Sequence, residues 1–248
     1  MTCPFPEPSR FASAADARDF ERVPLEERLP ALDLVRLWTH TAGVRGEALA
    51  LRFLPHGLPE DAVQDYSFEA LQSQVQAARA ALQAAGIHPE DRVALLVPNH
   101  PLTVSAMLAV QAEAVAAPIN IYLDAKEIAS LLEAIGAKLV VADGTIVEGK
   151  LQEILSHCRT APRCMSLAQL HAGEAAAPSG NPRDRSSEIV AIFHTGGTTG
   201  LPKLVPLSGL NIAAMALASA FAYGYLPQDR VFAAMPMFHV GGLLASTL

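Results

Sequence analysis

The chain has 248 residues, of which 51% are hydrophobic and 17% are charged. This composition excludes intrinsic disorder as the main state, and the length suits one large domain or two small ones. The 18 basic and 25 acidic residues give a net charge of −7. Because the lysines and arginines form no cluster, nucleic acid is not an expected partner.

Targeting signals are not evident in the sequence. The first 30 residues mix proline with charged residues and lack the apolar core of a signal peptide. Three cysteines, Cys3, Cys158 and Cys164, are too few for a disulfide scaffold and do not have metal-ligand spacing. The sequence therefore favours a cytoplasmic protein. It suggests no residue as a metal ligand. The uncharged stretch 204–228 could span a bilayer by length, but its alanine-rich composition favours a buried helix over 211–223.

The predicted elements follow an alternating order along the chain. After an irregular lead-in over residues 1–30, a short helix is expected near 32–43 and a strand over 48–53. A strong helix follows over Ser67–Ala85, capped by Ser67 and ended by Gly86. Further strands are predicted at 92–97, 115–120, 138–142, 164–167 and 188–194, with helices at 101–112, 125–135 and 147–157.

The predicted fold class is α/β, with layers of parallel sheet flanked by helices. Strand starts recur at intervals of roughly 22 to 25 residues, which is typical of strand–helix–strand units. A first α/β subdomain is expected over residues 31–170, a linker or surface loop over 171–187, and the start of a second α/β region over 188–248. Because charge is scarce in that last region and the sequence ends without a helix-stop signal, we interpret the chain as truncated. A C-terminal portion is expected to pack on residues 189–248.

One segment carries the main functional signal. The strand over 188–194 is followed by Thr195-Gly196-Gly197-Thr198-Thr199-Gly200-Leu201-Pro202-Lys203. Glycines let successive backbone N–H groups face one anion, threonine hydroxyls donate without adding charge, and lysine supplies a mobile cation. A Walker A loop is disfavoured because Lys203 lies between Pro202 and Leu204, and the glycine spacing of a dinucleotide fingerprint is lacking. A simple turn between two strands stays the structural alternative.

The segment Thr195–Lys203 resembles the phosphate-binding loop of the AMP-forming acyl-CoA synthetases, the adenylate-forming superfamily. That loop usually has the form Ser/Thr-Ser/Gly-Gly-Thr-Thr-Gly-x-Pro-Lys. Arg92–Asn99, the later Pro118-Ile119-Asn120 and the downstream Pro236–Gly242 resemble other family elements in the same order. Leu204 and Gly209 depart from the glycine and histidine common in the family. The resemblance implies a partial N-terminal domain of an acyl-CoA synthetase-like fold, because the family's adenine, ribose and C-terminal lysine motifs are not found in this sequence.

The resemblance also implies an activity. A small-molecule carboxylic acid would be activated by ATP and Mg²⁺ as an acyl-adenylate and then joined to coenzyme A. Two alternatives stay open: another acyl acceptor, or a truncated chain without catalytic activity. For His239, a satisfied core histidine is an equal alternative. The implied roles are catalysis by Lys203, phosphate binding by Thr195, Gly196, Gly197, Thr198, Thr199, Gly200 and Lys203, and a substrate pocket at Phe238, His239, Gly241 and Gly242.

Overall fold

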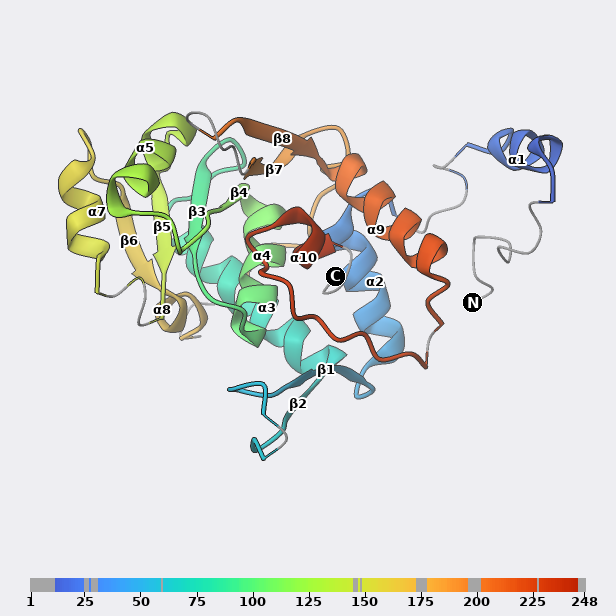
Figure 1. Cartoon of the computed structure of the whole chain (residues 1–248). Helices are drawn as coiled ribbons and strands as arrows, with labels where there is room; N and C mark the ends of the chain where they lie inside the picture. The colour runs from blue at the N-terminus through green and yellow to red at the C-terminus, as the bar shows by residue number, and fades with distance from the viewer. Residues whose placement is uncertain are drawn as a thin grey trace.

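The computed structural model of the protein describes residues 12–24, 27, 31–58, 60–144, 147, 149–172, 178–195, 202–226 and 228–244. The described part is built around a six-stranded sheet with helices on both faces (Figure 1). This layered arrangement confirms the predicted α/β class. For residues 221 and 244 the structure describes the backbone but not the side chain.

The main sheet is mostly parallel. Its strand order is β6-β5-β3-β4-β7-β8, and among the described strands of this sheet only β8 runs antiparallel to its neighbour. Parallel neighbours cannot be joined by tight turns, so helices connect them, as the strand–helix rhythm predicts. The strands are β3 (Arg92–Leu96), β4 (Val115–Pro118), β5 (Leu139–Ala142), β6 (Arg163–Ser166), β7 (Ile189–His194) and β8 (Leu204–Ser208).

More helices cover one face of this sheet than the other. One face is covered by α5 (Ala125–Ile135) and α7 (Leu151–His157). The opposite face carries the larger core cluster, and it is covered by α2 (Leu34–Arg45), α3 (Phe68–Ala84), α4 (Pro101–Glu113), α8 (Leu167–His171) and α9 (Gly209–Tyr223).

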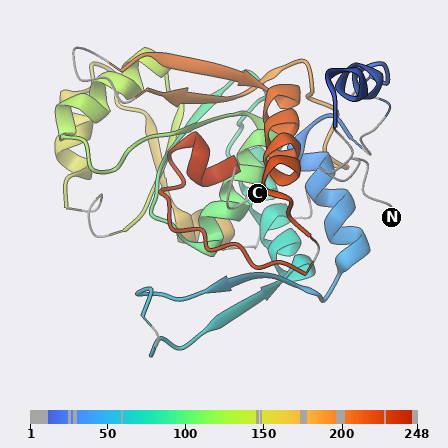
Figure 2. The same cartoon turned by 45° about the vertical axis from the view of Figure 1, so that its right-hand side comes forward.

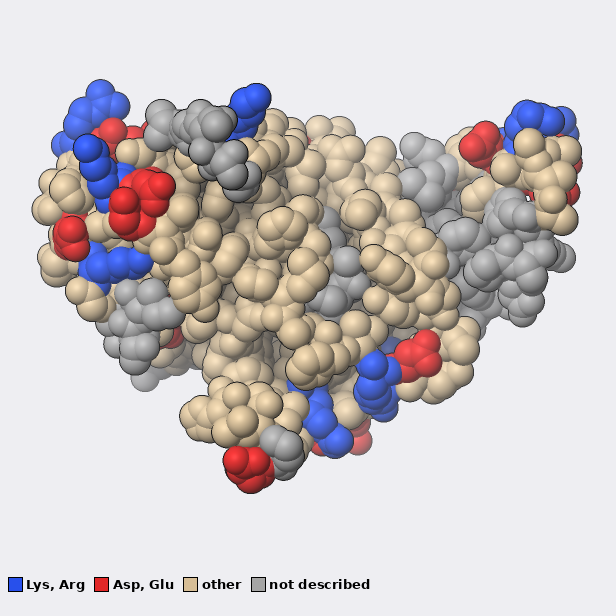
Figure 3. Space-filling view, in the orientation of Figure 1, with Lys and Arg blue, Asp and Glu red and all other residues tan. Residues whose placement is uncertain are grey.

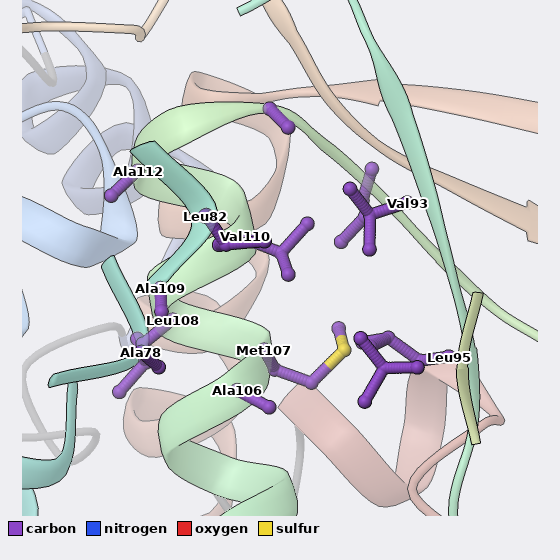
Figure 4. Close-up of a cluster of buried hydrophobic side chains, with 14 of the residues drawn as sticks. Ala78, Leu82, Val93, Leu95, Ala106, Met107, Leu108, Ala109, Val110 and Ala112 are labelled. Carbon is purple, nitrogen blue, oxygen red and sulfur yellow. The ribbon is translucent and has the colours of Figure 1, made fainter. Parts of the chain in front are cut away.

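Strand β3 lies at the centre of both cores. Its apolar side chains alternate between the two faces, and each is no more than 1% exposed. Val93 and Leu95 point toward Val110 and Met107 of α4 (Figure 4). A strand buried on both faces is typical of a parallel sheet enclosed by helices. Because α2, α3 and α8 cover its outer side, α4 is itself buried almost all round.

Local capping determines several helix boundaries, among them the predicted start of α3. Ser67 accepts a hydrogen bond from the backbone N–H of Ala70 and begins α3. Asp124 and Glu127 form a reciprocal capping box at the start of α5. Gly136 ends α5 in the left-handed conformation with φ of 65°, which costs glycine little because it lacks a Cβ atom.

The N-terminal region differs from the expected irregular lead-in. Helix α1 (Ala14–Glu21) forms there, begun by a capping box between Ser13 and Asp16. It buries none of its residues and lies apart from the sheet (Figure 1). A hairpin of β1 (Leu49–Phe53) and β2 (Gln64–Ser67) also lies apart, on the side of the molecule opposite β8 (Figure 2). The sequence predicts β1 but not β2, α8 or the short helix α10 (Val240–Leu244).

The uncharged stretch 204–228 divides into β8 and α9. The helix confirms the element predicted at 211–223, but it is buried along one side rather than all round. Ile212 and Ala213 are fully buried, whereas Met215 is 52% exposed. None of the helices in the described ranges combines the length and apolar character needed to cross a membrane.

The segment expected to be a linker is anchored in its described part, 178–187. Arg185 is 3% exposed, and its guanidinium donates to the backbone oxygens of Pro89, Gln111 and Ala114 and pairs with Glu188. Strands β7 and β8 then join the same sheet as β3–β6. The division into two α/β regions therefore stays a prediction, while the sheet itself continues across the proposed boundary.

Replacing Arg185 tests this anchor. Arg185→Met removes the donor to three backbone oxygens, those of Pro89, Gln111 and Ala114, and leaves Glu188 paired with Arg183 alone. The free energy of unfolding should therefore fall by about 3 kcal/mol or more, because hydrogen bonds from a charged group contribute about 1.5–3 kcal/mol each. The matched control is Arg183→Met, because that side chain also pairs with Glu188 but is 52% exposed, and its loss should cost less than about 1 kcal/mol. Urea unfolding followed by circular dichroism measures both, and equal losses would contradict the anchoring role.

Candidate functional site

Three segments of the candidate site leave the sheet at the same edge. Because β3, β4 and β7 are parallel, their carboxyl ends lie together, and ligands in open α/β sheets bind outside such ends. Asn99 follows β3, Asn120 follows β4, and Thr195 follows β7. The elements that resemble family motifs are therefore brought to one edge by the sheet.

The ends of the predicted phosphate loop are held together by two hydrogen bonds. The backbone N–H of Thr195 donates to the oxygen of Lys203 at 2.9 Å, and the N–H of Lys203 donates to Thr195 Oγ1 at 3.2 Å. Since Thr195 Oγ1 acts as the acceptor, its hydroxyl hydrogen is free to donate. The Lys203 side chain is exposed and has no ion pair with the described residues. Gly196, Gly197, Thr198, Thr199 and Gly200 lie outside the described residues.

His194, the last residue of β7, joins this loop to the end of β4. Its Nε2 accepts a hydrogen bond from the backbone N–H of Asn120 at 3.0 Å, so the neutral ring carries its proton on Nδ1. Nδ1 is buried and has no partner in the described part of the chain. Burial lowers the pKa of His194 most strongly, the Thr195 backbone raises it, and the nearby His239 lowers it.

The segment that precedes the predicted substrate pocket is held by Asn99. Asn99 Nδ2 donates to the backbone oxygen of Met235, and Asn99 Oδ1 accepts from the N–H of Met237, both at 2.8 Å. One carboxamide thus forms a two-point bridge to a segment about 137 residues later. The Met237 side chain is 5% exposed. Its burial and the two hydrogen bonds of Asn99 together fix this segment.

Phe238 and Tyr122 form the aromatic part of the candidate pocket. Their rings meet edge to face with centroids 6.1 Å apart. The loop that carries Tyr122 is held by Lys150, whose Nζ donates to the backbone oxygens of Ile121 and Leu123 at 2.7 and 2.6 Å. The ammonium group therefore determines the position of Tyr122 through its neighbours.

His239, Gly241 and Gly242 lie at the start of α10. The His239 side chain is exposed and accepts a hydrogen bond from the N–H of Gly241, which contradicts the alternative of a core histidine. A Cβ atom at Gly242 would lie 2.2 Å from the backbone oxygen of Pro236, so this glycine permits a close approach of backbone to backbone. That contact favours packing over open pocket space at Gly242.

Sequence reasoning missed several of these residues. Asn99 and Asn120 belong to the quoted motifs, but no role was predicted for either, and Tyr122, Lys150 and Arg185 were not singled out. The position of both asparagines directly after buried parallel strands is the signal that could have identified them. Among the described residues, no group of three or more His, Cys, Asp or Glu side chains is placed to hold a metal ion.

The comparisons identify the class of protein. Residues 38–248 match the family model of the AMP-binding enzymes, and the chain belongs to this family. It is 26% identical over 262 residues to marinolic acid–CoA ligase of Pseudoalteromonas sp. (strain SANK 73390), a match that covers 98% of this chain and 40% of the relative. It is 36% identical over 187 residues to oxalate–CoA ligase of Arabidopsis thaliana, covering 70% and 35%. The chain thus spans less than half the length of these relatives.

Solved structures show the same fold. The inhibitor-bound N-terminal domain of FACL13 from Mycobacterium tuberculosis matches with a TM-score of 0.72 at 25% identity, covering 86% of this chain and 53% of that one. o-Succinylbenzoate CoA synthetase from Bacillus subtilis, in complex with the acyl-adenylate OSB-AMP, matches with 0.71 at 23% identity, covering 86% and 52%. These likenesses confirm the predicted acyl-CoA synthetase-like fold.

The Asn99 bridge predicts a local change in hydrogen exchange. In Asn99→Leu the Met237 amide should exchange about tenfold faster or more, because one hydrogen bond contributes about 1 kcal/mol or slightly more. Asn99→Asp retains the Oδ1 acceptor but places a second oxygen against the Met235 carbonyl oxygen, so the Met237 amide should exchange more slowly than in Asn99→Leu. Hydrogen exchange followed by NMR measures both, with amides of β5 as a reference for global unfolding. Equal exchange of Met237 in the two variants would refute the bridge.

Three half-buried histidines predict a loss of stability in acid. Burial lowers the pKa values of His100, His171 and His194 below their ordinary 6.5. Below that pH the unfolded chain binds more protons than the folded one, so the free energy of unfolding should fall as the pH decreases from 7 to 5. Each proton contributes at most about 1.4 kcal/mol per pH unit. His194→Gln keeps an acceptor for Asn120 without titrating and should flatten the slope measured by urea unfolding.

The comparison for His194→Gln is the unmodified chain, measured at the same pH values. An equal slope of stability against pH in the two proteins would show that burial of His194 is not a cause of the loss in acid.

Proposed function

We propose that this chain forms the phosphate-binding part of an ATP-dependent ligase that activates a carboxylic acid and transfers it to coenzyme A. The observation that carries the proposal is the closed base of the Thr195–Lys203 loop at the carboxyl edge of the sheet, in a chain of the AMP-binding family. The named relatives support the reaction type, because they are CoA ligases.

The proposed reaction has two steps. A carboxylate oxygen of the substrate attacks the α-phosphorus of ATP, which forms an acyl-adenylate and releases pyrophosphate. The thiol of coenzyme A then attacks the acyl carbon and loses its proton, so that a C–S bond forms and the C–O bond to AMP breaks. Catalysis of the first step depends on positioning and on neutralising phosphate charge.

The described residues fit an anionic ligand at the loop. The Thr195 hydroxyl is free to donate, the Lys203 ammonium has no competing partner among described side chains, and His194 Nδ1–H is a buried donor without a partner. We assign Thr195 and Lys203 to the phosphates of ATP, with Lys203 as the catalytic cation. Gly196, Gly197, Thr198, Thr199 and Gly200 take the same role on sequence grounds. Mg²⁺ bound with ATP would share the phosphate charge.

The acyl group is assigned to the region of Phe238, His239 and Gly241. The ring of Tyr122 supports Phe238. The N–H of Tyr122 donates to Asn120 Oδ1, and the N–H of Asn120 donates to His194 at the start of the loop. The wall of the acyl pocket and the end of the phosphate loop are therefore neighbours, which the transfer of an acyl group to a nucleotide requires. The substrate class proposed is a small-molecule carboxylate.

Further protein is proposed to cover residues 189–248. Large apolar side chains on α9 and after it are exposed, with Tyr223 65%, Leu226 56% and Phe232 81% exposed. The face that carries α9 and α10 shows few charged groups at its centre, and the charges gather around its margins (Figure 3). Apolar surface of this kind marks an interaction site. A cytoplasmic location is proposed with it, supported by the free thiols of Cys158 and Cys164.

Binding of ATP with Mg²⁺ to the purified chain tests the phosphate site. Lys203→Ala should weaken binding at least about tenfold in isothermal titration calorimetry, because a hydrogen bond to a charged group contributes about 1.5–3 kcal/mol. The control Arg18→Ala removes the same formal charge from the exposed helix α1, outside the residues that match the family, and should bind as the unmodified chain does. No saturable binding by the unmodified chain, or equal weakening in both variants, would count against the proposal.

The alternatives separate in an activity assay on the complete product of the gene. Carboxylate-dependent exchange of pyrophosphate into ATP indicates an adenylating enzyme, and formation of a coenzyme A thioester distinguishes CoA from another acyl acceptor. Saturable binding of ATP without exchange for any carboxylic acid in a broad panel would favour the non-catalytic alternative.

A further inference from the structure

A small internal cavity lies away from the loop and the acyl pocket. It is lined by the start of α2, the end of α4, the segment that leads into β7 and the start of α9, and its volume is about 10 Å³. Its polar lining consists of Asp33, Gln111, Arg183 and Arg185. A space of this size accommodates one water molecule and no larger ligand.

Two polar atoms of this lining are unpartnered. Asp33 Oδ1 caps α2 by accepting from the N–H of Arg36 at 2.9 Å. The backbone N–H of Arg185 also favours the charged carboxylate, but no well-formed hydrogen bond reaches Asp33 Oδ2 from the described residues. Gln111 Nε2 lacks one as well. Asp33 is 4% exposed and Gln111 is 2% exposed, so bulk water does not reach them. Buried polar groups of native proteins are nearly always hydrogen-bonded, which makes two such atoms on one cavity an unusual coincidence.

The charges around the cavity restrict what it can hold. Four of the five N–H groups of the Arg185 guanidinium already donate, to Pro89, Gln111, Ala114 and Glu188. An anion would find little donor capacity there and would face the Asp33 carboxylate. A cation would lie beside two arginines and the N–H₂ group of Gln111. A neutral molecule that both accepts and donates satisfies both atoms.

We propose that this cavity is the binding site of one internal water molecule, which accepts a hydrogen bond from Gln111 Nε2 and donates one to Asp33 Oδ2. The water joins the cap of α2 to α4, and both lie against the segment that Arg185 anchors. The water supplies the two hydrogen bonds that the side chains of Asp33 and Gln111 do not obtain from the chain itself.

The site has a consequence for the ionisation of Asp33. Burial raises the pKa of this carboxyl group, while backbone N–H groups of Arg36 and Arg185 favour the charged form. The other charged groups near it are Asp184 and the side chains of Arg36, Arg183 and Arg185. A water that donates to Oδ2 favours the carboxylate, and its loss should raise the pKa of Asp33 further.

A crystal structure of the 248-residue chain at high resolution tests the site directly. The expected result is one density peak within about 2.6–3.2 Å of both Asp33 Oδ2 and Gln111 Nε2. A cavity without density, a direct bond between Asp33 and Gln111, or a peak with the coordination of a metal ion would overturn the proposal.

A variant supplies a second readout in solution. Gln111→Met removes the donor while keeping the volume, so the NMR titration midpoint of the Asp33 carboxyl carbon should rise by about one pH unit, a tenfold change in proton affinity. Gln152→Met, an exposed position on α7 at the other face of the sheet, is the control and should leave the midpoint unchanged. An unchanged midpoint in a folded Gln111→Met chain refutes the water, and if that variant does not fold, the density of the unmodified chain decides.

Discussion

The parallel pairing of β3, β4 and β7 is the constraint on which the candidate site depends. Parallel strands need helical crossovers, and these helices bury both faces of the sheet, so only the strand ends are free to carry polar function. Segments from residues 99, 120 and 195 therefore meet at one edge although the chain separates them widely. The apolar side chains of β3, buried on both faces, hold that edge rigid beneath the loops.

Hydrogen bonds from side chains fix the loops that lie beyond the ends of the strands. The carboxamide of Asn99 substitutes for a neighbouring strand by bonding to both Met235 and Met237. His194 accepts one hydrogen bond from the backbone of Asn120, and Lys150 donates two to the turn that carries Tyr122. Each bridge uses a polar side chain to fix a loop that has no regular structure of its own.

Local chemistry explains which elements the sequence could predict. Ser67, Asp124 and Gly136 act on their own neighbours, so the helix boundaries that they form could be read from short motifs. Helix α1 was missed because its eight residues include a single large apolar side chain, Phe20, although its Ser13–Asp16 capping box is a local signal. Strand β8 was missed because its uncharged sequence continues into α9. The bond from Asn99 to Met237 spans 138 residues and follows from the fold, not from either segment alone.

The same bridges connect the two halves of the candidate site. His194 ends the strand before the phosphate loop and bonds to Asn120, whose Oδ1 accepts from the N–H of Tyr122. The Tyr122 ring meets Phe238, so a continuous series of contacts runs from the loop to the aromatic wall. Residues from separate strand ends are thus joined by side-chain and backbone contacts instead of strand pairing. For this reason no single segment of the sequence displays the whole site.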